Sequence, residues 1–94
     1  MVYGKLRIHL ADGSFLDVWF SRRIPNRYAY HWERRPINGS IYRHDNRPHE
    51  RLKGMKNFPR HFHDGNEDNI KESMINEDPK KAIREFLNFI RSKL

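Results

Sequence analysis

The sequence contains no cysteine. This absence excludes disulfide bonds, thiolate zinc ligands and a cysteine nucleophile, so any metal would have to bind His, Asp or Glu. The chain also has no apolar run near the roughly 20 residues that a membrane-spanning helix needs. Its first residues, MVYGKLRIHLADG, carry charges where a signal peptide would have its apolar segment. We therefore expect a cytoplasmic protein that does not associate with membranes.

Acidic residues are scarce in the first two-thirds of the chain. Residues 1–63 hold 13 Lys and Arg against 5 Asp and Glu, whereas residues 64–94 hold 6 against 7. A positive charge concentrated on one region favours polyanionic partners, because each neutralised phosphate releases counterions. Nucleic acid is the expected partner, although many small basic proteins bind nothing specific.

Ninety-four residues fit one small domain with a thin core, which a homodimer would help to stabilise. Strict alternation of apolar and polar residues predicts four β-strands, at 5–10, 16–20, 27–32 and 40–44. Turn residues separate these runs, notably Asp12-Gly13 and Asn38-Gly39. Consecutive strands with short turns form an antiparallel meander, which we expect to occupy residues 1–46.

The C-terminal segment, residues 78–94, has a helical pattern. Asp78 is an N-cap candidate and Pro79 suits the first helical position. Apolar residues recur at helical spacing at Ala82, Ile83, Phe86, Leu87, Ile90 and Leu94. The predicted fold class is α+β, a four- to five-stranded antiparallel sheet with this amphipathic helix packed on one face.

The intervening residues 47–77 lose both patterns, because Pro and Gly interrupt every candidate element. We interpret them as a long His-rich loop with a possible fifth, edge strand at 69–73. A loop of this length in a small domain is usually functional or disordered.

Imidazoles and arginines gather around this loop and are suited to metal-free RNA cleavage. Such cleavage needs a base for the 2′-hydroxyl proton, an acid for the leaving 5′-oxygen and a cation for the phosphate. Histidine can carry protons near neutral pH, and arginine can bind phosphate through two N–H groups. The candidate catalytic residues are His49, His61 and His63 for proton transfer, Arg43 for the phosphate and Asp45 to orient an imidazole. Asn46, Arg47, Arg60 and Lys56 are candidates for substrate binding.

Two other interpretations of the cluster stay open. His61-x-His63 on an extended segment would place both imidazoles on one face, where His49 or Asp45 could complete a metal site. Alternatively, each histidine could hydrogen-bond a loop carbonyl and have a structural role. The metal-free interpretation, which needs no cofactor, is preferred.

Aromatic residues on the predicted strands have structural interpretations. Tyr28, Tyr30 and Trp32 share one face and are expected in the core rather than as a base-stacking platform. Trp19 lies on the opposite face from its apolar neighbours, so its exposure would favour a protein partner or a dimer interface. His9 and His31 lie in alternating strands without chemical companions nearby and are left out of the site.

The order of YRHDNRPH at 42–49 and NFPRHFH at 57–63, before a closing amphipathic helix, resembles the TumE-like family of toxins. The resemblance covers nearly the whole chain. It implies a toxin of a prokaryotic type II toxin–antitoxin pair that acts through RNA, with a cognate antitoxin as partner. By position, the signature residues are Arg43, Asp45, Asn46, His49, His61 and His63, and the resemblance assigns them no roles. The family often has an aromatic residue in place of His44, which argues against a catalytic role for His44.

Without chemistry of its own, the same basic surface would serve as a non-catalytic nucleic-acid-binding or protein-interaction module. The preferred interpretation is a metal-independent ribonuclease toxin.

Overall fold

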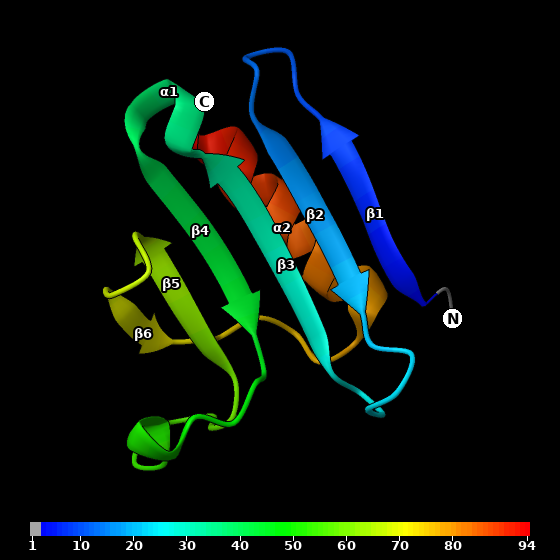
Figure 1. Ribbon diagram of the computed structural model, residues 1–94, viewed down its shortest axis with the longest axis vertical. Coiled ribbons are helices and arrows are strands. Elements are labelled where there is room, and N and C mark those ends of the chain that lie inside the picture. Colours follow the sequence, from blue (N-terminus) through cyan, green and yellow to red (C-terminus); the bar gives the residue numbers. More distant parts are fainter. Residues whose placement is uncertain (1–2) are drawn as a thin grey trace.

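A computed structural model describes residues 3–94 of the chain. Its centre is one antiparallel sheet in which the strands follow sequence order from β1 to β6, so the predicted meander is confirmed (Figure 1). The expected number of four to five strands is wrong, because the sheet has six within residues 3–94. The strands are β1 (Gly4–His9), β2 (Phe15–Phe20), β3 (Tyr28–Arg34), β4 (Ser40–Asp45), β5 (His61–Gly65) and β6 (Ile70–Glu72).

The additional strand is β5, which lies inside the segment predicted as loop. In the sequence HFHDG, histidine and aspartate take positions where a strand usually shows aliphatic residues. The structure nevertheless buries His61 and His63 on one face of the strand and packs Phe62 on the other. The edge strand expected at 69–73 is present as β6.

Two short helical turns connect strands. Helix α1 (Arg35–Asn38) replaces the simple turn expected between β3 and β4, and it ends at Gly39, whose positive φ of 78° suits glycine. The 3₁₀ turn η1 (Glu50–Leu52) follows β4 and anchors the loop through the buried side chain of Leu52.

Helix α2 (Pro79–Lys93) confirms the predicted C-terminal helix and lies across one face of the sheet (Figure 1). The Asp78 side chain caps it by accepting a hydrogen bond from the Lys80 amide. Its buried residues Ala82, Phe86 and Ile90 lie four residues apart and pack on the sheet. The predicted apolar stripe is wrong at Leu87 and Leu94, which are exposed, while Phe89 joins the packed side. No helix in the described part is long and apolar enough to cross a membrane.

The sheet face under α2 is the core. Tyr30 and Trp32 are 2% and 0% exposed there, which confirms the prediction that this aromatic stripe is structural. The indole N–H of Trp32 donates to Ser14 Oγ at 3.0 Å, so its polar atom is satisfied inside the core. Because strand side chains alternate, the residues between these positions point to the opposite face, away from α2.

Candidate functional site

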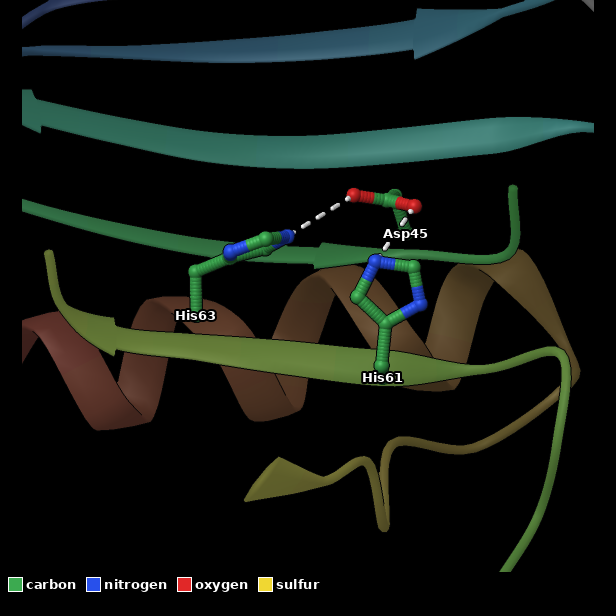
Figure 2. A group of neighbouring side chains, drawn as sticks. All are labelled: Asp45, His61 and His63. Carbon is green, nitrogen blue, oxygen red and sulfur yellow. Dashed lines mark ion pairs between the residues drawn. The ribbon is translucent and has the colours of Figure 1, made fainter. Parts of the chain in front are cut away.

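Three side chains on the face opposite α2 form a compact cluster of two imidazoles and a carboxylate. The antiparallel register pairs Asp45 on β4 directly with His61 on β5, and His63 lies two residues further along the same face. Figure 2 shows the Asp45 carboxylate between the two imidazole rings. The His61 Nε2 atom lies 3.1 Å from Asp45 Oδ1, and His63 Nε2 lies 3.5 Å from Asp45 Oδ2. Alternation and register alone thus bring together three of the predicted site residues.

The other ring nitrogen of each imidazole is held by a backbone carbonyl. His61 Nδ1 is 3.0 Å from the Pro59 oxygen, and His63 Nδ1 is 2.8 Å from the Glu67 oxygen. A carbonyl oxygen only accepts hydrogen bonds, so each Nδ1 must carry the proton. Both Nε2 atoms are buried without a hydrogen-bond partner, since their short contacts with Asp45 lack hydrogen-bond direction.

Arg43 connects this cluster to two further residues. The Arg43 Nε atom lies 3.2 Å from Asp45 Oδ2, and Nη1 and Nη2 each donate a hydrogen bond to one carboxylate oxygen of Glu67. Its Nη1 also lies 3.3 Å from His31 Nδ1, and His31 Nε2 lies 3.3 Å from Glu33. The prediction that His31 has no chemical companions is therefore wrong. Cross-strand pairing of His31 with Arg43 produces this contact.

Two members of the cluster border a groove of about 650 Å³, called here the Asp45 groove. Asp45, His63 and the more accessible His49 line it, as do Arg27, Arg43, Arg47 and Arg51. His61 is 0% exposed and does not reach the groove, although its ring centre is 5.5 Å from that of His49 and 5.0 Å from that of His63. The imidazoles predicted to gather therefore do so in two layers, one open to the groove and one behind it.

The surroundings perturb the protonation of the cluster. Burial alone would raise the pKa of Asp45, but His61, His63 and the Arg47 amide outweigh it and hold this pKa well below its usual range. Burial likewise works against protonated His61, yet the Asp45 carboxylate prevails and raises the His61 pKa. The pKa of His49 is lowered by burial and by the nearby His61.

The remaining predicted site residues lie in different places. Arg47 lines the groove, and its amide donates to Asp45 Oδ1 at 3.0 Å. Asn46 instead fixes the β3 end by contacting the Tyr28 amide and the Asn26 carbonyl. Arg60 donates to the Ile75 carbonyl, and Lys56 is exposed in the loop; neither borders the groove.

His44 packs on the opposite face from Asp45, as its neighbouring position on β4 requires. Its ring stacks on Phe62 with ring centres 4.3 Å apart, and Nδ1 lies 2.7 Å from Ser73 Oγ. Burial lowers the pKa of His44 to about 4. This position agrees with the inference that His44 has no catalytic role.

Glu67 is the residue at the site that sequence reasoning missed. It lies in the β5–β6 connection, where an exposed glutamate resembles any solvated loop charge, and its spacing from Arg43 carries no recognisable pattern.

Trp19, expected only as a contact for a protein partner or a dimer, is partly exposed and lines the Asp45 groove. The expected homodimer stays a prediction.

Fold and site together define the class of protein. It is a small basic α+β domain with a buried carboxylate–imidazole cluster beside an arginine-lined groove. A family model described as "Toxin TumE" matches residues 1–94, the entire chain. The chain therefore belongs to the TumE toxin family, which confirms the resemblance noted in the sequence. Searches of curated proteins and of solved structures found no match.

Membership identifies the chain as the toxin component of a toxin–antitoxin system and implies an antitoxin protein as its partner.

Proposed function

We propose that this toxin is a ribonuclease whose RNA substrate binds in the Asp45 groove. The observation that supports this proposal best is the composition of the groove, which is lined by four arginines together with His49, His63 and Asp45. Arginine binds phosphate through paired N–H groups, and imidazole transfers protons at neutral pH. Phosphate binding and proton transfer are the two tasks of metal-free RNA cleavage, and this lining supplies groups suited to both.

The exposed arginines are proposed to hold the phosphate backbone. Arg47 and Arg51 border the groove and are both exposed, so they can approach a phosphate with little desolvation. Arg43 differs from them, because Glu67 and Asp45 already occupy its guanidinium. Its proposed role is therefore to hold Asp45 in position and to stabilise the charge of the phosphate that is cleaved, rather than to attract the RNA.

His49 is the preferred candidate for proton transfer with the 2′-hydroxyl. It is the most accessible of the three candidate histidines, since His61 and His63 are buried, and it lines the groove. In the proposed reaction, the 2′-oxygen attacks phosphorus as its proton leaves, and the 5′-oxygen departs with a proton from a second group. His63 borders the groove close to Asp45 and is the candidate for that second group in the metal-free form of the mechanism, a role that requires its buried Nε2 to become accessible when RNA binds. His61, which does not reach the groove, is a positioning residue that supports Asp45.

The test is an RNA-cleavage assay with purified protein, run both with chelator and with added Zn²⁺ or Mn²⁺, so that a metal requirement cannot hide activity. His49→Gln should lower the cleavage rate about 100-fold or more, as expected for loss of a general acid–base group. The matched control is His9→Gln on β1, at an exposed histidine separated from β5 by the width of the sheet. Its rate should equal that of the unmodified protein.

The outcome against the proposal is RNA binding without any product under either condition. A steep salt dependence with no cleavage would favour the alternative of a non-catalytic nucleic-acid-binding module. Equal rates for His49→Gln and His9→Gln would remove His49 from the mechanism.

A further inference from the structure

We propose that Asp45, His61 and His63 bind one divalent transition-metal ion of the Zn²⁺, Mn²⁺, Fe²⁺ or Co²⁺ class. The proposal goes beyond the ribonuclease proposal and does not depend on it, because metal binding can be measured without RNA. It commits to Asp45 as the third ligand, a choice between His49 and Asp45 that the sequence left open.

The positions of the Nε2 lone pairs support a metal ion. The carbonyls of Pro59 and Glu67 fix the proton of each neutral imidazole on Nδ1, which leaves an unprotonated Nε2 of each ring 3.1 or 3.5 Å from a carboxylate oxygen. Carboxylate oxygens are acceptors as well, so two buried contacts place acceptor against acceptor. Such contacts are unfavourable unless a positive species lies between them. Metal-binding histidines have this arrangement, with the second ring nitrogen donating to a carbonyl or carboxylate.

A single proton can satisfy only one of the two contacts, whereas one metal ion can satisfy both. Protonating both Nε2 atoms would place two imidazolium groups and the Arg43 guanidinium around a single carboxylate. Neither Nε2 atom has a hydrogen-bond partner despite the short distances to Asp45. A metal ion does not need to lie on the line joining nitrogen and oxygen, and it can satisfy all three acceptors together.

The distances agree with ligation. His61 Nε2 lies 3.1 Å from Asp45 Oδ1 and His63 Nε2 lies 3.5 Å from Asp45 Oδ2, and one ligand atom from each residue lies within 4.8 Å of the other two. Ligand atoms about 2.1 Å from a common metal are separated by about 3.0 Å in octahedral geometry and about 3.4 Å in tetrahedral geometry. Both imidazole–carboxylate contacts are close to this range, and any wider separation within the set must shorten for the three residues to enclose one ion.

Two carboxylates offset part of the positive charge around the site. Asp45 and Glu67 supply two negative charges against the guanidinium of Arg43, which pairs with both. Arg27, Arg47 and Arg51 also line the groove and oppose a cation, although Arg47 and Arg51 are exposed, so solvent screens them. Three protein ligands leave coordination positions open, which is typical of catalytic rather than structural metal sites.

The experiment is a calorimetric titration of chelator-treated, dialysed full-length protein with ZnCl₂, and separately with MnCl₂. We expect one Zn²⁺ per chain with a Kd below about 10 µM, and His63→Gln should weaken it by at least about 100-fold. His49→Gln and His9→Gln are the controls, and both should bind Zn²⁺ within about threefold of the unmodified protein. A loss of binding in His49→Gln equal to that in His63→Gln would overturn the proposed ligand set.

A second measurement keeps the test decisive if His63→Gln fails to fold. Nitrogen-15 NMR of the unmodified protein should show two imidazoles that keep their Nδ1 proton while Nε2 shifts on addition of Zn²⁺. Absence of one-to-one binding, or shifts confined to other histidines, would refute the site. Metal binding without RNA cleavage would support the site and count against the ribonuclease proposal, whereas cleavage in chelator without metal binding would do the reverse.

Discussion

Replacing His44 by phenylalanine should remove part of the acid sensitivity of the fold. His44 stacks on Phe62, lies edge-on to Phe86 and shares a short contact with the buried Ser73 hydroxyl. Burial lowers its pKa from 6.5 to about 4, so the folded protein keeps this ring neutral where the unfolded chain would protonate it. The neutral His44 ring therefore makes its full contribution to the free energy of unfolding above pH 6.5, and this contribution is lost as the pH falls towards 4.

The size of the effect follows from these two pKa values. At pH 5 the unfolded chain gains about 2 kcal/mol from protonating His44 that the folded state hardly gains, whereas at pH 7.5 the difference is close to zero. Phenylalanine retains the stacking but leaves the Ser73 hydroxyl without its ring partner, a cost that does not depend on pH. His44→Phe should therefore be less stable near pH 7.5 and lose about 2 kcal/mol less than the unmodified protein on acidification to pH 5.

The assay is urea denaturation of both proteins at pH 7.5 and pH 5, with the free energy of unfolding obtained by linear extrapolation. Other titrating groups, Asp45 and His61 among them, are common to both proteins and cancel in the comparison. Parallel loss of stability in the two proteins would refute the reasoning, because it would mean that folding does not perturb the His44 ring.

Two further predictions concern the core and the groove. Phe86 is 2% exposed at the centre of the helix–sheet contact, so Phe86→Ala should lower the free energy of unfolding by about 3–5 kcal/mol in urea denaturation. A loss below about 1 kcal/mol would contradict the described packing. Arg51→Gln should weaken RNA binding whatever the RNA sequence and reduce the slope of log affinity against log salt by about 1. Arg91→Gln, at the exposed end of α2, should leave that slope unchanged.

Elements with regular periodicity could be predicted from the sequence. Strands β1 to β3 show apolar residues at alternate positions, and α2 adds a cap and a proline at its start. These patterns follow from burying one face of a strand or helix, so they reveal the elements. They reveal the buried face of β2 and β3, but not of the edge strand β1, where Leu6 and Ile8 are exposed. The aromatic stripe of β3 could be assigned to the core for the same reason.

Strand β5 could not be predicted, because its buried residues are polar. The alternation of His61, Phe62 and His63 is regular, but period-2 patterns are detected by hydrophobicity, and neither face is aliphatic. Burial of His61 and His63 depends on Asp45 and on two carbonyls contributed by neighbouring segments. Such partners are known only once the strands are paired.

The membership of the site was predicted better than its internal order. Residue types and spacing indicated that Arg43, Asp45 and the histidines act together, but not that His61 lies behind the groove. The contact of Glu67 with Arg43 depends on the path of the β5–β6 loop, and the contact of His31 with Arg43 depends on the register of β3 and β4. Neither can be predicted from the local sequence.

The same alternation that builds the core also builds the site. Along β4, His44 points to α2 while Asp45 points to the groove, and along β5 Phe62 separates His61 from His63 in the same way. A one-residue slip of β5 against β4 would turn Phe62 into the groove and turn His61 and His63 towards the core, away from Asp45. Stacking of Phe62 under α2 therefore fixes the register that brings Asp45 between the imidazoles. Core packing and site geometry are consequently determined by one set of contacts, so core substitutions that loosen β5 should disturb the site before they unfold the domain.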